Sequence, residues 1–137
     1  MPRPRLLRPT IGALMVLVAL VALGVAWLRP QHTRVVDIRE GTGAAVKVGV
    51  TVVVHHVGTL ADGEEFDNSR TRGTPVDFPI GRGTVIKGWD AGMIGMRVGG
   101  LRRLVIPIEE GYGEKGMPPV IPPKSKLIFE VELLAIK

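Results

Sequence analysis

Residues 46–60, VKVGVTVVVHHVGTL, decide the fold. The stretch is rich in β-branched side chains, which pack well on the pleated surface of a strand. Side chains two positions apart point to the same face of a strand. That spacing puts four side chains on one face: Val50, Val52, Val54 and His56. The stretch therefore predicts a β-strand.

Further strands are predicted on both sides of this stretch. Residues 101–108 (LRRLVIPI) and 126–136 (KLIFEVELLAI) alternate apolar and polar side chains between turn signals, as strands do. Residues 35–39 (VVDIR) and 76–80 (VDFPI) are weaker candidates, and Pro79 makes the second an edge strand or a bulge. The predicted core face of the last strand carries Leu127, Phe129, Val131 and Leu133.

Residues 87–96, KGWDAGMIGM, form the helix candidate. The spacing of Trp89, Met93 and Met96 puts the three side chains on one helical face. The glycines make the helix weak in isolation, so it needs packing against a curved sheet to persist. The sequence thus predicts an α+β domain with one short helix on an antiparallel sheet.

Composition excludes several classes of function. The chain has 137 residues, 45% of them hydrophobic, and no Cys. It has room for one ordinary domain, and disulfides, thiolate metal sites and cysteine nucleophiles are excluded. Five of the 18 basic residues lie before residue 35, where no acidic residue occurs, so the remaining 13 balance the 13 acidic residues. The body therefore lacks the basic field that nucleic-acid binding needs.

The N-terminal part carries a membrane signal. Residues 1–10 are basic, and residues 11–28, IGALMVLVALVALGVAWL, form an apolar run without a charged side chain. An 18-residue helix covers most of a hydrocarbon core about 30 Å thick. The run exceeds the usual signal-peptide core of about 7–15 residues, which favours an uncleaved transmembrane anchor. A cleaved secretory signal is the alternative, because small residues at 22–26 suit a signal peptidase.

Both interpretations export the rest of the chain. The run is preceded by three arginines, Arg3, Arg5 and Arg8. Positively charged residues beside a membrane span stay on the cytoplasmic side. Residues 29–34 are a short linker, and residues 35–137 are the functional domain. We expect a single-pass protein of the inner or cytoplasmic membrane with this domain on the periplasmic or extracytoplasmic side. After signal cleavage, the domain would instead be secreted to the periplasm.

Three stretches in the body resemble the FKBP-type peptidyl-prolyl cis/trans isomerases. They are VTVVVHHVGTLADGEEFDNSR, FPIGRGTVIKGWDAGMIGMRVGGLRRLVIPIEEGYGEKG and VIPPKSKLIFEVELL, in family order and at family spacing. The resemblance covers essentially all of residues 35–137. It implies a curved antiparallel sheet of five or six strands wrapped around one short helix, with a proline-binding cavity between helix and sheet.

The resemblance also implies roles for individual residues. Trp89 matches the floor under the prolyl ring, the backbone N–H of Ile86 the donor to a substrate carbonyl, and Asp67 a carboxylate paired with Arg72. The matching catalytic residues are Asp67, Tyr112, Trp89 and Phe129. The matching substrate-binding residues are His56, Phe66, Val76, Val85, Ile86, Met117 and Ile121.

Three of these positions depart from the best-known family members. His56 stands where a tyrosine is common, Val76 replaces an aromatic residue, and Met117 replaces a histidine or an aromatic residue. The departures bear on substrate preference and macrolide affinity, and we expect weaker macrolide binding because of His56. We interpret His56 as a satisfied core or rim histidine rather than a proton-transfer group.

The resemblance implies an enzyme that accelerates rotation of X–Pro bonds in exported or envelope proteins during folding. No cofactor and no metal is required, and the implied partners are proline-containing polypeptides, macrolide ligands and, through residues 11–28, a membrane. We expect a monomeric domain. Two alternatives remain open: a proline-peptide binding module with poor turnover, and a general chaperone.

Overall fold

Residues 31–137 are described by a computed structural model and form one compact unit. The predicted anchor or signal at residues 11–28 lies outside the described residues, and so do the first two residues of the predicted linker; its last residue, Arg34, already belongs to the first strand. Among residues 31–137, no helix combines the length and apolarity that crossing a bilayer requires.

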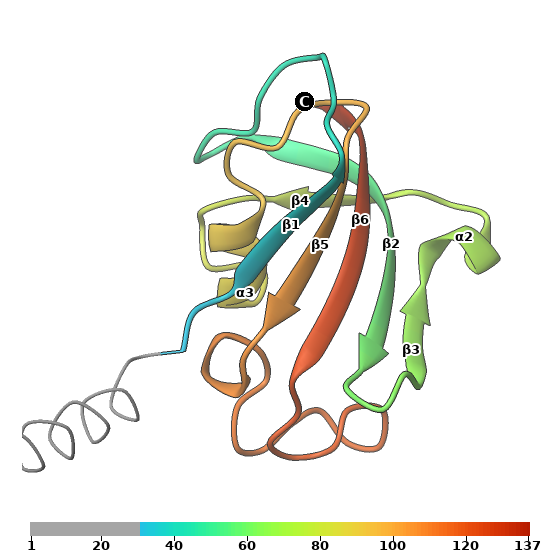
Figure 1. Ribbon diagram of the computed structural model, residues 1–137, viewed down its shortest axis with the longest axis vertical. Coiled ribbons are helices and arrows are strands. Elements are labelled where there is room, and N and C mark those ends of the chain that lie inside the picture. Colours follow the sequence, from blue (N-terminus) through green and yellow to red (C-terminus); the bar gives the residue numbers. More distant parts are fainter. Residues whose placement is uncertain (1–30) are drawn as a thin grey trace, which may run out of the picture. The chain divides into compact units, whose positions relative to one another are not determined.

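The fold is a six-stranded antiparallel sheet, as predicted (Figure 1). The strands run in the order β1-β5-β6-β2-β3, and β4 also pairs with β2. The two long central strands, β2 and β6, pair along most of their length. The strands are β1 (Arg34–Arg39), β2 (Thr51–Leu60), β3 (Glu65–Asn68), β4 (Val76–Pro79), β5 (Leu101–Ile106) and β6 (Leu127–Ile136).

One edge of β2 is shared by two short strands. β3 pairs with the C-terminal part of β2, and β4 pairs with its N-terminal part. Between them the chain leaves the sheet as the short helix α2 (Ser69–Arg72), which the sequence analysis did not predict. Asn68 caps the helix by accepting from the backbone N–H groups of Arg70 and Thr71. The ladder along β2 is therefore interrupted opposite its middle residues.

Helix α3 (Lys87–Gly92) packs against β5 at close range because two of its residues are glycines. A Cβ at Gly88 would lie 2.6 Å from Ile106, and one at Gly92 would lie 2.7 Å from Leu104. The glycines that weaken the isolated helix thus permit its approach to the sheet. This close approach sets the position of the helix over the sheet.

The helix is shorter than the predicted residues 87–96. It ends at Gly92, and the turn that follows contains Gly95 at a φ of 79°. Buried Arg102 donates to the carbonyl oxygens of Gly92 at 2.9 Å and Ile94 at 3.0 Å. These carbonyls lose their helical partners at the end of α3, and the guanidinium replaces them.

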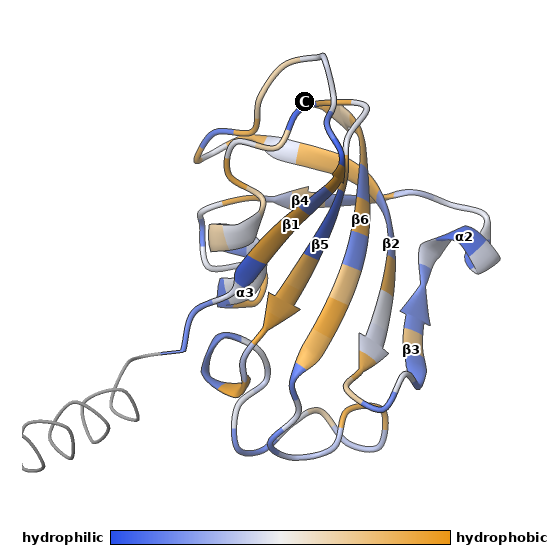
Figure 2. Ribbon diagram, viewed as in Figure 1, coloured by the Kyte–Doolittle hydropathy of each residue, from blue (hydrophilic) through white to orange (hydrophobic). Residues whose placement is uncertain are grey.

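The core lies between α3 and one face of the sheet, and the predicted faces are confirmed. Along β2 every second side chain is buried, and the same holds for most of β6. Figure 2 shows this alternation of hydrophobic and hydrophilic residues along the strands. The buried side chains from the predicted faces are Val52, Val54, His56, Trp89, Met93, Met96, Leu127, Phe129, Val131 and Leu133.

Two predicted strands are shorter than their apolar patterns indicate. β2 begins only at Thr51, because Gly49 adopts a φ of 93° in the preceding turn. β5 ends at Ile106, because Pro107 has no N–H for the ladder and precedes the 3-10 helix η1 (Ile108–Glu110).

Candidate active site

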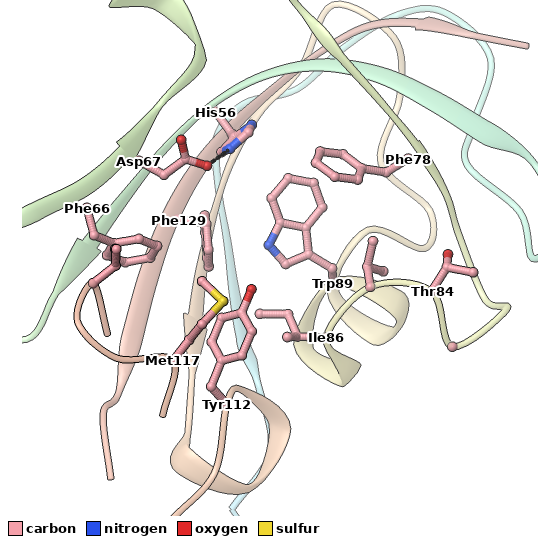
Figure 3. A pocket seen from close by; sticks show the side chains of 13 residues that line it. His56, Phe66, Asp67, Phe78, Thr84, Ile86, Trp89, Tyr112, Met117 and Phe129 are labelled. Carbon is pink, nitrogen blue, oxygen red and sulfur yellow. Dashed lines mark hydrogen bonds and ion pairs between the residues drawn. The ribbon is translucent and has the colours of Figure 1, made fainter. Parts of the chain in front are cut away.

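A cavity of about 620 Å³ opens between α3, the sheet and the loops around them (Figure 3). Nine of the eleven predicted site residues line it: His56, Phe66, Asp67, Val85, Ile86, Trp89, Tyr112, Met117 and Phe129. Four further residues complete the lining: Phe78, Gly83, Thr84 and Val120. Residues from distant parts of the chain are thus gathered around one space, as the resemblance implies.

Four aromatic rings form what we call the aromatic wall: Phe66, Phe78, Trp89 and Phe129. The centroids of Trp89 and Phe129 lie 5.3 Å apart at 83°, and those of Phe66 and Phe129 lie 5.5 Å apart at 89°. Phe78 meets the indole at 5.0 Å. Such edge-to-face contacts are favourable beyond simple burial of area, and each ring restricts the next. The wall is therefore a preformed apolar surface.

Gly58 on β2 makes room for two of these rings. A Cβ at this position would lie 2.6 Å from Cζ of Phe66 and 2.8 Å from Cε1 of Phe129. Real Cβ atoms do not approach ring carbons so closely, so any other residue would displace a ring. The absence of a side chain at Gly58 is thus part of the construction of the wall.

The loop before α3 is held by Asp90, a residue that sequence reasoning missed. Its carboxylate accepts from the backbone N–H of Gly81 at 2.7 Å and of Gly83 at 3.0 Å. This places Val85 and Ile86 at the mouth of the cavity. Within residues 31–137 no acceptor pairs with the backbone N–H of Ile86. That N–H is available for a ligand carbonyl.

One edge of the cavity is charged, and we call it the polar corner: His56, Asp67 and Arg72. One carboxylate oxygen of Asp67 lies 2.6 Å from Nε2 of His56, and the other accepts from Arg72. Partial burial raises the pKa of the Asp67 carboxyl, but hydrogen bonds from Arg72 and His56 outweigh it and lower this pKa below its ordinary value. Asp67 is therefore an ionised carboxylate at neutral pH.

The backbone of His56 is held by Ser69, where the ladder along β2 is interrupted. The fully buried hydroxyl of Ser69 accepts from the His56 N–H at 2.8 Å and lies 3.3 Å from the His56 carbonyl oxygen. The Ser69 hydroxyl oxygen also lies 2.9 Å from Nδ1 of His55, which is on the opposite face of the strand. A side chain thus replaces the missing strand partner, which fixes the point from which the His56 ring enters the cavity.

Tyr112 stands on the rim opposite the polar corner (Figure 3). Burial, together with the negative charge of Asp67, raises the pKa of its hydroxyl, so the group stays protonated. Among residues 31–137 this hydroxyl has no hydrogen-bond partner, and it is therefore a free donor. Met117 and Val120 flank it with exposed apolar surface.

Two predicted substrate contacts, Val76 and Ile121, are not among the residues that line the cavity. Ile121 is fully buried in the core and pairs with Met117 in a small bridge. Val76 lies half-buried opposite Val54, outside the cavity lining. Phe78 takes the place expected for Val76. The period of two along β4 puts Phe78 on the same face as Val76, and this signal could have identified it.

These features agree with the family to which the chain belongs. Residues 43–134 match the model of the FKBP-type peptidyl-prolyl cis-trans isomerase family, and the chain is a member of it.

Relatives and a solved structure support the assignment. The chain is 51% identical over 100 residues to FK506-binding protein 1 of Dictyostelium discoideum, covering 73% of this chain and 94% of the relative. It is 49% identical to the FK506-binding protein of Neisseria meningitidis serogroup A, covering 73% and 92%. The crystal structure of AtFKBP13 superposes with a TM-score of 0.71 at 39% identity, covering 77% of this chain and 93% of that one. The protein is therefore a peptidyl-prolyl cis-trans isomerase.

Proposed function

We propose that the cavity isomerises X–Pro bonds in exported or envelope proteins, with the prolyl ring held against Trp89. The observation that carries the proposal is the aromatic wall facing two unpaired donors, the backbone N–H of Ile86 and the hydroxyl of Tyr112. An apolar surface receives the ring, and the donors receive the carbonyl groups on either side of it.

The reaction makes modest chemical demands. Rotation about a peptide bond meets a barrier of about 18–20 kcal/mol because resonance gives the C–N bond double-bond character. The planar amide is more dipolar and better hydrated than the twisted transition state. An apolar cavity removes the water that stabilises the planar form, and fixed dipoles then favour the twisted one. A barrier lower by about 4 kcal/mol gives a roughly thousandfold acceleration, without breaking a covalent bond.

Each polar group has a distinct task in this scheme. The N–H of Ile86 and the hydroxyl of Tyr112 orient the substrate backbone so that the ring enters the cavity in one pose. Asp67 supplies a fixed negative charge on one side of the amide whose bond rotates. Its hydrogen bonds to His56 and Arg72 hold that charge in place before the substrate arrives.

A second proposal concerns another ligand of the same cavity. Relatives of this chain carry the name FK506-binding protein, and we propose that this domain binds FK506 with its aromatic wall. We expect weaker binding than in members with a tyrosine at the position of His56, and a titration of the wild type against His56→Tyr tests this.

We further propose that the isomerase acts outside the cytoplasm. The proposal rests on the apolar run at residues 11–28 and the arginines that precede it. Alkaline extraction of membranes and sequencing of the mature N-terminus test it. A chain retained in the membrane with its first residues intact supports an anchor, and a soluble chain that begins near Val25 or Trp27 supports a cleaved signal.

The proposed activity is tested by an isomerisation assay on the full chain. A peptide with one X–Pro bond should equilibrate faster in its presence, and an excess of FK506 should abolish the acceleration because both ligands occupy the cavity. Tight FK506 binding with isomerisation at the uncatalysed rate would leave only the binding-module alternative.

A further inference from the structure

His56 is only half satisfied by its surroundings. Nε2 of the imidazole makes the 2.6 Å contact with Asp67, but Nδ1 has no hydrogen-bond partner among residues 31–137. The residue is 3% exposed, so water does not reach that nitrogen. Native proteins rarely leave a buried polar atom without a hydrogen-bond partner. The protonation state of this ring therefore bears on the structure of the cavity.

The contact with Asp67 defines the tautomer. The lowered pKa of Asp67 keeps its carboxylate ionised, and an ionised carboxylate only accepts hydrogen bonds. The Nε2 atom of His56 must therefore carry a hydrogen. In the neutral ring, the lone pair then lies on buried Nδ1.

Among residues 31–137, the groups around the ring offer no acceptor for a second proton. The imidazole meets Trp89 from α3 at 5.5 Å and 90°, Phe78 from β4 at 5.8 Å, and Phe129 from β6 at 6.1 Å. The titratable groups that face it come from other elements: Asp67 from β3, Arg72 from α2 through Asp67, and Tyr112 on the rim. A proton on Nδ1 would thus place an unpaired N–H among aromatic rings.

Protonation would also change the charge of the cavity. With neutral His56, the charges of Asp67 and Arg72 cancel within the polar corner. With a protonated ring, the corner carries a net positive charge beside the aromatic wall. An unpaired N–H and an unbalanced charge both favour entry of water or rotation of the ring, and each disturbs the dry surface on which the prolyl ring rests.

We propose that His56 is a positioning residue that holds Asp67 and the aromatic wall in the active arrangement only while its Nδ1 is unprotonated. The domain is then an isomerase whose activity falls in acid through one histidine. The proposal rests on the proposed use of the cavity for the prolyl ring.

The test is a pH profile of kcat/KM for the full chain at constant ionic strength. As the pH is lowered from neutral, the wild type should lose about tenfold in kcat/KM with a one-proton slope. His56→Tyr keeps a donor toward Asp67 without titrating in acid, so its profile should be flat. His32→Gln removes an exposed imidazole outside the cavity and should keep the wild-type profile.

Nuclear magnetic resonance of the imidazole nitrogens gives a second measurement that needs no variant. At neutral pH, His56 should show the tautomer with hydrogen on Nε2, and the appearance of a hydrogen on Nδ1 should coincide with the loss of activity.

The outcomes separate this proposal from the proposed function. A wild type that is active but independent of pH, an acid limb that persists in His56→Tyr, or hydrogen on Nδ1 at neutral pH would overturn the role of His56 alone. A wild type without isomerase activity at every pH would instead overturn the proposed use of the cavity.

Discussion

The aromatic wall and the polar corner line the same cavity but are built on different principles. The wall takes its rings from β3, β4, α3 and β6, and they hold one another by edge-to-face contacts. The corner depends on hydrogen bonds among three side chains and on their charges. The strength of apolar packing does not depend on pH. The strength of hydrogen bonds between charged groups changes when one of the groups gains or loses a proton. The comparison indicates that the wall provides the catalytic surface and the corner adjusts it.

The largest effect is expected from removing the floor of the wall. Trp89→Ala should lower kcat/KM by about a hundredfold, because the prolyl ring loses its main contact surface. The same isomerisation assay measures it. Loss of a buried tryptophan costs about 3–5 kcal/mol of stability, so Trp89→Phe is the companion variant, with an expected loss of about tenfold.

Ile94→Ala is the matched control for Trp89. Ile94 is a partly exposed apolar residue just after α3 and outside the cavity, so its truncation should leave kcat/KM unchanged. Equal losses in Trp89→Phe and Ile94→Ala would mean that the wall contributes stability rather than catalysis.

Gly58→Ala should damage the wall without removing a ring. The added methyl group would push Phe66 or Phe129 toward the cavity, and we expect a loss of about tenfold in kcat/KM. Gly58→Ala combined with Phe66→Leu should recover part of the loss, because the smaller side chain yields the space. A double variant no better than Gly58→Ala would contradict this account of the glycine.

Smaller effects are expected from the donors at the mouth of the cavity. Tyr112→Phe removes one neutral hydrogen bond to the substrate, which corresponds to an increase in KM of about threefold to tenfold. Steady-state kinetics measure this increase.

Asp90→Ala releases the loop that presents Ile86 and should raise KM in the same way. A fall in kcat at constant KM would show that these residues act on the rotation step itself.

The smallest effect concerns the stability of the polar corner. The pKa of Asp67 is lowered in the folded state, so its contribution to stability is present above the ordinary carboxyl pKa of about 4 and is lost as the pH falls through the folded value. Thermal unfolding should therefore show wild type more stable than Asp67→Asn at neutral pH, with the two melting temperatures converging in acid. Parallel melting curves would contradict the coupling.

The sequence predicted the core face of the sheet and three of the four rings of the wall, and the resemblance supplied all three residues of the polar corner. Strand periodicity identifies which side chains share a face, and the positions of Val52, Val54, Phe129 and Val131 followed from it. Rings on a common face of a curved sheet converge whatever the details of the loops. The resemblance to the family then assigned Trp89 to the floor.

The missed features depend on local geometry that periodicity does not encode. The interruption between β3 and β4 is filled by α2 and Ser69, and no apolar pattern marks it. Ile121 is fully buried at a bridge with Met117 within a loop, and no strand pattern marks this position. The unpaired Nδ1 of His56 follows from the angle of a single ring, which only coordinates reveal.

Exchange spectroscopy by nuclear magnetic resonance on an X–Pro peptide tests the central claim most directly. With a small amount of the full chain, cis and trans signals should exchange, and the prolyl ring protons should show nuclear Overhauser contacts to the assigned indole of Trp89 and the ring of Phe129. Accelerated exchange with contacts to neither ring would place the reaction outside the cavity and contradict the account.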